Sequence, residues 1–321
     1  MDPETKQETG KKENQDTIEV IDHPTIPEDT ILHPYIFGPW LLEPSRSEIY
    51  QCSKVAEDSK VIAKLVHKDK HYSEIKAEQV ALSVLKHPIL ISSLDIQKYD
   101  EFYIFFFERY TEGDFLDLIR RRYQNNETLP ESFLARFFYL IAWGISYMHS
   151  SGFVHGDIKL ENILLSQRSR VDGHYALFPV LIDFGCSARV DENGVLNSSK
   201  GTLNYAAPEV LNEESHSFPA DIWSYGVTLF TAITGHNPFN INLENLNIDT
   251  FNLDPLEKEL REMNVSESFI DLILHLLDRN PDARTKFDDI LKHPWFDEFY
   301  PEDERELDIN ICLERSNGPI I

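Results

Sequence analysis

The chain has 321 residues, of which 41% are hydrophobic, and a formal net charge of -25. This apolar content suffices for one large core or two adjoining lobes, and no apolar run approaches the ~20 residues that a membrane span needs. A nucleic-acid partner is not expected, because binding to phosphates needs a basic surface. The acidic balance would favour basic substrates, although solubility alone would also explain it.

The three cysteines, Cys52, Cys186 and Cys312, are widely spaced and odd in number. They match no metal-ligand spacing and predict a reducing compartment. No apolar stretch follows Met1, so we expect no signal peptide. An intracellular protein, cytoplasmic or nuclear, is therefore predicted. The oligomeric state is not set by the sequence, and a monomer is the default.

The first part of the chain is predicted to be a small sheet with one helix. Residues 1 to about 33 are polar, with few aromatic side chains, and indicate a disordered tail before it. Short β-rich runs follow at Val61–Ala63 and Phe102–Phe107. Between them, Tyr72–Lys86 carries apolar residues along one face and stops before a proline, which predicts a helix.

After Gly113 the chain is predicted to be mainly helical. One predicted helix is long and apolar, one is apolar nearly all round, as expected at the centre of a lobe, and two come later: Phe133–Ser150, Asp221–Ile233, Phe269–Leu277 and Phe287–Trp295. Residues 240–253 are rich in asparagine and indicate a loop. The acidic residues after Tyr300 are expected to be loosely attached.

The stretch from His155 to Asn162 carries the chemistry. It contains Asp157 and Lys159, and an Asp-Phe-Gly triplet begins at Asp183, 21 residues after Asn162. Phosphoryl transfer needs such a set: a carboxylate to orient a hydroxyl, a cation for the transferring phosphate, and an amide and a carboxylate for magnesium. Each motif alone is weak, but the ordered set is specific.

Together these motifs resemble the catalytic core of the eukaryotic protein kinases. The resemblance implies that Asp157 accepts the proton of the substrate hydroxyl and that Lys159 neutralises charge on the γ-phosphate of ATP. It also implies that Asn162 and Asp183 hold Mg²⁺ through oxygen ligands. The implied cofactors are therefore ATP and Mg²⁺.

The resemblance also implies a nucleotide site. Lys64 and Glu78 match the strand lysine and the helix glutamate that fix the α- and β-phosphates, with a surface ion pair as the alternative. Ile62 and Phe107 stand at positions that would narrow the adenine pocket, unless they are ordinary variation in an active kinase. Residues implied around the base and ribose are Ile49, Ile62, Glu108, Tyr110, Asp114 and Leu164.

Downstream segments agree with this resemblance. Gly201–Glu209 resembles the end of a kinase activation segment, and Asp221–Gly226 resembles the start of the family's buried central helix. Arg284 matches the arginine that pairs with the glutamate of the segment, here Glu209. Lys159 together with Thr202 is similar to serine/threonine kinases more than to tyrosine kinases.

The implied fold is α+β and two-lobed, with a small antiparallel-sheet-plus-helix N-lobe and a larger helical C-lobe. His293-Pro294-Trp295-Phe296 resembles the last helix of many calcium/calmodulin-type kinases. The implied kinase domain covers 34–297, with its N-lobe at about 34–110 and its C-lobe at about 111–297. The flanking segments, 1–33 and 298–321, are expected to be tails.

One part of the family pattern is broken. The glycine-rich loop that covers the phosphates would have Leu42, Pro44 and Ser47 in place of its three glycines. Alternatively the loop is shortened and Gly38 belongs to the strand before it. Either way the backbone approaches phosphates less freely, and Pro44 has no N–H to donate.

The resulting prediction is a serine/threonine kinase that transfers the γ-phosphate of ATP to proteins. The missing glycines favour an alternative, a catalytically impaired kinase-like scaffold or nucleotide-sensing module. Phosphorylation of small molecules is a third reading, which the peptide-docking character of Gly201–Glu209 disfavours. Gly156 replaces the arginine that ordinarily binds an activation-loop phosphate, and this implies constitutive competence or control through the tails.

Overall fold

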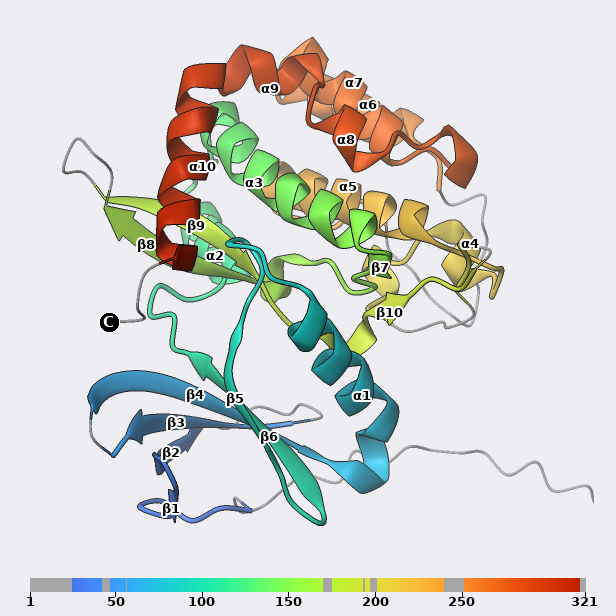
Figure 1. Cartoon of the computed structure of the whole chain (residues 1–321). Helices are drawn as coiled ribbons and strands as arrows, with labels where there is room; N and C mark the ends of the chain where they lie inside the picture. The colour runs from blue at the N-terminus through green and yellow to red at the C-terminus, as the bar shows by residue number, and fades with distance from the viewer. Residues whose placement is uncertain are drawn as a thin grey trace, which may run out of the picture.

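The structure is a computed structural model, and it describes residues 25–41, 47–55, 57–169, 175–192, 194–196, 201–239 and 251–317. These residues form a small lobe built on a sheet and a larger helical lobe (Figure 1). The chain passes from one lobe to the other after strand β6. The predicted two-lobed α+β architecture is therefore confirmed.

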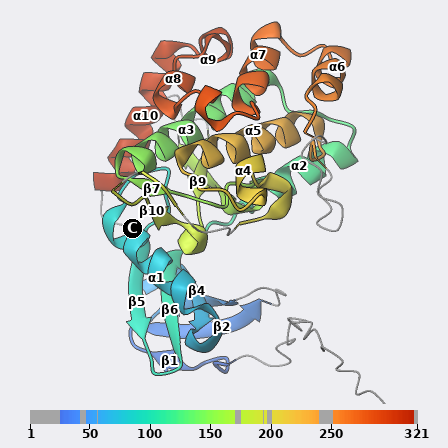
Figure 2. The ribbon, with the colours of Figure 1, turned by 90° about the vertical axis from the view of Figure 1, so that its right-hand side faces the viewer.

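The small lobe is a six-stranded antiparallel sheet with strand order β1-β2-β3-β4-β6-β5. Its one helix, α1, follows β4 and lies between the sheet and the large lobe (Figure 2). The bounds are β1 Ile31–Leu32, β2 Tyr35–Leu41, β3 Glu48–Lys54, β4 Glu57–His67, α1 Lys68–Val84, β5 Ser93–Lys98 and β6 Phe102–Glu108.

Strand β6 is buried on both faces of the sheet, and its successive side chains point to opposite faces. On β6, Phe105 belongs to the main core beside α1, and Phe106 belongs to a second apolar cluster on the far face. Tyr35 stacks on Phe106 there, with 3.7 Å between ring centroids, and Ile26 closes the same cluster. A strand buried on both sides is expected to be a continuous apolar run, and β6 is apolar from Phe102 to Phe107.

The disordered tail predicted over 1–33 is wrong for its last nine residues, 25–33. The N–H of Asp29 donates to the carbonyl of Phe37 at 2.8 Å, and the N–H of Phe37 donates to the carbonyl of Thr30 at 2.9 Å. Ile26 is 5% exposed. The polar composition did not indicate that this segment is ordered, because its attachment depends on backbone hydrogen bonds and one buried side chain. Residues 1–24 lie outside the described part of the chain.

The large lobe is mainly helical, and α3 and α5 lie side by side at its centre in both views (Figures 1 and 2). No helix within the described ranges is long and apolar enough to cross a membrane. The elements are α2 Phe115–Gln124, α3 Glu131–Ser150, β7 Phe153–Val154, β8 Ile163–Ser169, β9 Tyr175–Leu181, β10 Ala188–Arg189, α4 Pro208–Leu211, α5 Phe218–Thr234, α6 Asp254–Glu262, α7 Glu267–Leu276, α8 Phe287–Ile290, α9 Pro294–Phe299 and α10 Glu302–Asn317.

The helix predicted over Phe287–Trp295 is two helices. α8 ends at Ile290, and α9 begins at Pro294. His293 between them is extended, with φ -66° and ψ 139°. A residue before proline avoids the helical region, and proline suits the first position of a new helix, so the break is set locally.

The loose attachment predicted for the residues after Tyr300, within the predicted tail 298–321, is also wrong for the described part. α10 packs against α3 and the β8–β9 pair (Figure 1). Its fully buried Asp308 accepts hydrogen bonds from Arg136 Nε at 2.6 Å and from Tyr300 Oη at 2.9 Å. Cys312, one turn later, is also fully buried. The acidic composition did not indicate that one narrow face of this helix is buried.

Candidate active site

Asp221, in the first turn of α5, anchors the loop that carries the predicted catalytic residues. Its carboxylate is almost fully buried and accepts the N–H groups of His155 at 2.8 Å and Gly156 at 2.9 Å. His149 Nε2 is 2.9 Å from the same carboxylate. Burial alone would raise the pKa of Asp221, but His149 and these N–H groups hold it below its ordinary value.

Sequence reasoning noted Asp221 as the start of a helix and missed this anchoring role. An acidic residue in the first turn of a helix gains from the helix dipole whether or not it binds anything else. The available signal was its place at the head of a segment that is otherwise buried all round. A carboxylate there is costly unless it is paired.

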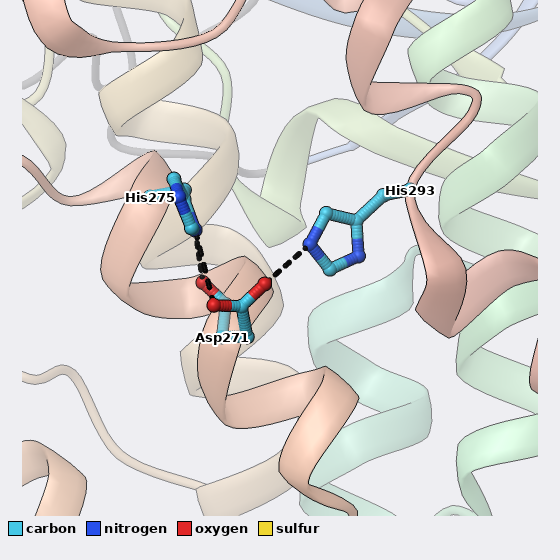
Figure 3. Close-up of side chains that lie close together, drawn as sticks. All are labelled: Asp271, His275 and His293. Carbon is cyan, nitrogen blue, oxygen red and sulfur yellow. Dashed lines mark hydrogen bonds and ion pairs between the residues drawn. The ribbon is translucent and has the colours of Figure 1, made fainter.

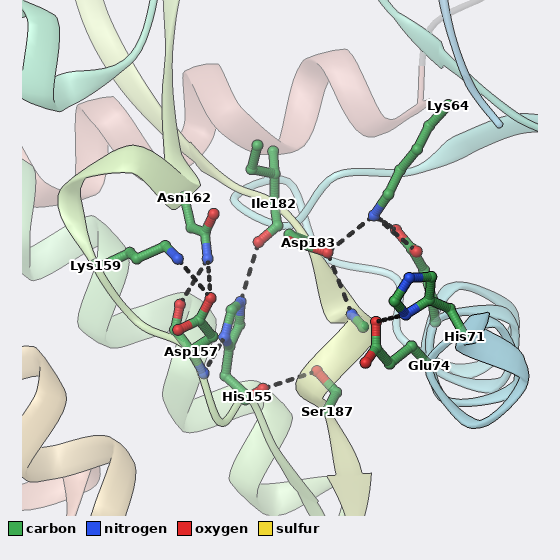
Figure 4. Close-up of polar contacts among 12 residues, drawn as sticks. Lys64, His71, Glu74, His155, Asp157, Lys159, Asn162, Ile182, Asp183 and Ser187 are labelled. Carbon is green, nitrogen blue, oxygen red and sulfur yellow. Dashed lines mark hydrogen bonds and ion pairs between the residues drawn. The ribbon is translucent and has the colours of Figure 1, made fainter. Parts of the chain in front are cut away.

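The three predicted residues of the catalytic loop lie together (Figure 4). Lys159 Nζ is 2.8 Å from Asp157 Oδ2. The Asn162 amide nitrogen donates to Asp157 Oδ2 at 3.0 Å and to the Asp157 carbonyl at 2.8 Å. Because the nitrogen of Asn162 is used in this way, its amide oxygen is the atom that suits a metal ion.

Thr202 reaches the other oxygen of the same carboxylate. Its N–H and its hydroxyl donate to Asp157 Oδ1 at 2.9 Å and 2.7 Å, and Lys159 Nζ donates to the hydroxyl at 2.7 Å. Gly201, just before it, has φ +124°, and a Cβ added there would lie 2.5 Å from the Gly156 carbonyl oxygen. The close contact between the two segments therefore requires glycine at 201.

Lys64, Glu78 and Asp183 form a second cluster. Lys64 Nζ lies 3.0 and 2.9 Å from the two oxygens of Glu78 and 2.9 Å from Asp183 Oδ1. Burial alone would lower the pKa of Lys64, but the two carboxylates raise it above its ordinary value. Burial alone would raise the pKa of Asp183, but Lys64 lowers it to about 2. Both groups are therefore charged at neutral pH.

The two clusters line one cleft of about 370 Å³ between the lobes. The residues that line it come from the strands of the small lobe, from α1 and from the loops of the large lobe. They are Ser47, Lys64, Val66, Glu74, Ile75, Glu78, Asp157, Lys159, Asp183, Gly185, Cys186, Gly201 and Thr202. Five of the predicted site residues thus line this cleft, and a sixth, Asn162, is hydrogen-bonded to Asp157, which lines it. The donor set of carboxylates, amide and lysine suits a Mg²⁺-bound phosphate chain.

Comparison with known sequences agrees with this geometry. Residues 44–296 match the protein kinase domain as a sequence family. The chain belongs to the protein kinase family. The predicted relationship is therefore confirmed, whereas the finer resemblance to calcium/calmodulin-type kinases stays a prediction.

Curated relatives carry serine/threonine kinase names. Serine/threonine-protein kinase GIN4 of Saccharomyces cerevisiae is 33% identical over 222 residues, which are 68% of this chain and 18% of that protein. CBL-interacting protein kinase 2 of Oryza sativa subsp. japonica is 27% identical over 275 residues, 83% and 58% of the two chains. CBL-interacting serine/threonine-protein kinase 3 of Arabidopsis thaliana is 30% identical over 256 residues, 77% and 52%. The chain thus spans between 18% and 58% of the length of these relatives.

The residues predicted around the base and ribose of ATP do not line the cleft of the two clusters. On adjacent strands, Ile49 is paired with Lys64. Asp114 caps α2 by accepting the Asp117 N–H at 2.8 Å, and it bridges Leu164 on β8. The full set lies on β3, β4, the end of β6, the link after it, and β8: Ile49, Ile62, Glu108, Tyr110, Asp114 and Leu164.

Four residues that line the cleft were missed as site residues: Val66, Glu74, Ile75 and Cys186. Periodicity would have indicated two of them. Val66 lies two residues after Lys64 on the same strand, so it shares a face with Lys64. Glu74 lies four residues before Glu78 on α1, so it is one turn away on the same face.

The unusual phosphate-covering loop is partly outside the described residues, since Leu42 and Pro44 fall in the gap at 42–46. Ser47 follows the gap and lines the cleft. Gly38 belongs to β2, where an added Cβ would lie 3.0 Å from the Gln51 carbonyl oxygen. Gly38 therefore lies in the strand before the loop, which agrees with both readings, and the shortened loop stays a prediction because it falls outside the described residues.

Gly156, in place of the family's arginine, has φ +79°. A Cβ added to it would lie 2.7 Å from the Cys186 carbonyl oxygen. This backbone contact joins the catalytic loop to the segment after the Asp-Phe-Gly triplet. A larger residue would require one of the two segments to move.

A histidine cluster outside the cleft is explained by its own hydrogen bonds. Asp271, His275 and His293 bring their ligand atoms within 4.8 Å of one another (Figure 3). His293 Nδ1 accepts the Trp295 N–H at 3.3 Å, so its proton lies on Nε2, 3.0 Å from Asp271. A metal-bound imidazole needs the reverse tautomer, with a bare nitrogen toward the ion. We therefore interpret the cluster as a link between α7 and α9.

Proposed function

We propose that this chain is a serine/threonine protein kinase that transfers the γ-phosphate of ATP to protein hydroxyl groups. The observation that supports this most strongly is the convergence of Asp157, Lys159, Lys64 and Asp183 on one cleft. The serine/threonine kinase names of the relatives agree with it. ATP and Mg²⁺ are the proposed cofactors, and proteins are the proposed substrates.

In this proposal Asp157 orients the attacking hydroxyl and accepts its proton. Thr202 and Lys159 hold its two oxygens, so the carboxylate is fixed before substrate arrives. A positioned base of this kind is worth ~10²–10⁴ in rate. Lys159, 2.8 Å from Asp157, would bring its positive charge to the transferring phosphate.

Lys64 would bind the α- and β-phosphates, and Glu78 would hold it in place for this role. Asn162 and Asp183 would hold Mg²⁺, which neutralises negative charge on the β- and γ-phosphates when it is bound. The Lys64–Asp183 contact of 2.9 Å keeps both groups charged and close to where the phosphates would lie. The remaining proposed residues would surround the base and ribose.

The deciding experiment measures Mg-ATP binding by calorimetry and phosphate incorporation into a basic protein substrate on the same preparation. We expect both from the wild-type chain. Asp157→Ala should abolish incorporation and keep the fold and most of the ATP affinity, because the carboxylate acts on the hydroxyl rather than on the nucleotide. Binding without turnover in the wild type would favour the impaired, nucleotide-sensing reading. Equal residual incorporation in wild type and Asp157→Ala would assign the signal to another enzyme.

The extent of the proposed kinase unit is larger than the predicted 34–297. Ile26 and Leu32 of segment 25–33 pack in the outer apolar cluster of the small lobe, and α10 is held by the buried Arg136–Asp308 pair. We therefore include both in the folded unit. We also propose a reducing, cytoplasmic or nuclear location, since Cys52, Cys186 and Cys312 are thiols.

A further inference from the structure

The segment Thr25–Thr30, here called the N-terminal strap, is attached to strand β3 by its first two residues. The N–H of Thr25 donates to Glu48 Oε2 at 2.8 Å, and the Thr25 hydroxyl donates to Glu48 Oε1. The N–H of Ile26 donates to the hydroxyl of Tyr50 at 3.1 Å. Ile26 itself fills the apolar cluster on the far face of the sheet.

The carboxylate that holds the strap is buried. Glu48 is 2% exposed, and it also accepts the Tyr50 hydroxyl and lies 3.0 Å from His67 Nε2. Burial alone would raise the pKa of Glu48, but the hydrogen bonds from Thr25, Tyr50 and His67 lower it. A buried carboxylate is tolerated only when its lone pairs are satisfied, so the strap supplies two of the donors that this charge needs.

Glu48 and His67 occupy two positions that lead directly into the nucleotide cleft. Glu48 begins β3 and stands between Ser47, which lines the cleft, and Ile49, which pairs with Lys64. His67 ends β4 and is the N-cap residue of α1, the helix that carries Glu78. The strap therefore joins the strand after the phosphate-covering loop to the start of the helix that positions Lys64.

We propose that the N-terminal strap positions β3 and α1 for nucleotide binding, and that Thr25 is a phosphorylation site at which the strap is released. This regulatory role rests on the proposed kinase function. Thr25 as a residue is exposed, but its hydroxyl is bound to Glu48, so another kinase molecule can reach the hydroxyl only once the strap lifts. Phosphorylation would replace the hydroxyl donor by a group that carries about two negative charges. The buried Glu48 carboxylate cannot accommodate this group beside it, because the two like charges repel each other.

The modifying step is an ordinary phosphoryl transfer from ATP. The Thr25 Oγ1 forms a bond to the γ-phosphorus, the bond from that phosphorus to the bridging oxygen breaks, and ADP leaves. The hydroxyl proton passes to the base of the kinase that acts in trans. Because the bound strap hides this hydroxyl against Glu48, the phosphate is added to the released state and keeps the segment there.

The test uses the full 321-residue chain in four forms: wild type, Thr25→Ser, Thr25→Val, and the chain with phosphothreonine installed at position 25. Hydrogen exchange of β3 and of the first two turns of α1 reports strap release without any need for activity. Calorimetric titration with Mg-ATP reports the consequence. Thr25→Ser is the matched control, since it keeps the hydroxyl donor.

Thr25→Ser should match the wild type in both measurements. Thr25→Val loses one hydrogen bond to a charged group, so exchange in both segments should rise on the order of tenfold. Phosphothreonine should raise exchange further and weaken Mg-ATP binding. Unchanged exchange and unchanged affinity in the phosphorylated chain would overturn the proposal, as would a Thr25→Ser variant that behaves like the phosphorylated chain.

This outcome is separable from the proposed kinase activity. Suppose that hydrogen exchange responds to phosphate at Thr25 but no form of the chain transfers phosphate to a substrate. The proposed role of the strap is then supported, and the proposed kinase function is contradicted. If the wild type transfers phosphate and exchange does not respond, the kinase function stands and the strap role fails.

Discussion

At the scale of single residues, the site is held together by hydrogen bonds and ion pairs to buried carboxylates. Asp221 fixes the backbone at His155 and Gly156, and Thr202 and Lys159 fix the two oxygens of Asp157. None of these contacts is local in sequence except that of Lys159. The spacing of the motifs predicted which residues meet in the catalytic loop, but not which distant residues hold them there.

The glycine at 156 gives a prediction at this scale. Gly156→Ala should lower kcat/KM strongly, because its Cβ would lie 2.7 Å from the Cys186 carbonyl oxygen and displace the catalytic loop. Gly194→Ala is the matched control, since Gly194 also has positive φ, +75°, but nothing within 4 Å of the added Cβ. The control should lose about 1 kcal/mol of stability from backbone strain and keep its activity. Equal activities in the two variants would contradict the steric reading.

His87 predicts a pH dependence of stability. Its ring lies between Trp143 and Tyr147, with centroid distances of 4.1 and 5.1 Å, and its buried Nε2 has no hydrogen-bond partner among the described residues. Burial therefore lowers the pKa of His87 from 6.5 to about 4. Between these values the unfolded chain binds a proton that the folded chain does not, so stability falls as pH drops through this window.

Urea unfolding of the wild type and of His87→Phe at pH 7.5 and pH 5.0 checks this prediction. Because of His87, the free energy of unfolding of the wild type should be about 2 kcal/mol lower at pH 5.0 than at pH 7.5. His87→Phe keeps an aromatic ring between its neighbours and cannot titrate. Its free energy of unfolding should therefore decrease by about 2 kcal/mol less than that of the wild type over the same pH change. Parallel losses in both proteins would mean that His87 is not the responsible group.

At the scale of elements, α10 shows how far composition can mislead. Its sequence is acidic, yet Asp308 and Cys312 are fully buried against the rest of the large lobe. Its attachment depends on a pair of opposite charges, Arg136 and Asp308, that are 172 residues apart in sequence. Hydrophobic periodicity cannot indicate such a partner, because the buried face is partly ionic.

Asp308→Ala should therefore destabilise the protein by about 3–5 kcal/mol, since it leaves the Arg136 guanidinium buried without its carboxylate. Asp303→Ala, on the exposed first turn of the same helix, is the control and should stay within about 0.5 kcal/mol of the wild type. Chemical denaturation at neutral pH measures both. A small effect at Asp308 would mean that α10 contributes little to the fold.

The same scale shows what the sequence predicts well. The helices predicted at Phe133–Ser150 and Asp221–Ile233 match α3 and α5 closely, because long apolar segments can only be buried helices here. The β6 strand was found for the same reason. Helix breaks and the N-terminal strap were missed, because they depend on one proline or on single hydrogen bonds rather than on a pattern.

At the scale of the whole molecule, the two lobes meet at a cleft whose charged groups are held by the chain's own side chains. Asp157 is bound by Thr202 from the activation segment, and Lys64 is bound by Glu78 from α1 and by Asp183. The position that in the family reads an activation-loop phosphate is Gly156, which offers no cation. Regulation through such a phosphate is therefore not expected here.

This leads to a prediction about control of the proposed kinase activity. Ser198 and Ser199 are the phosphosites that the sequence predicts in the activation segment, and they lie outside the described residues. A phosphate there would find Arg189 and Lys200 as the nearby cations of the segment, so it would gain little by ordering the loop. The double variant Ser198→Ala with Ser199→Ala should keep its initial rate within a few-fold of the wild type, and phosphatase treatment of the wild type should do the same. Initial rates of phosphate incorporation at saturating Mg-ATP measure both, with Asp157→Ala as the blank. A large loss in both experiments would show that another cation of the chain takes the place of the missing arginine.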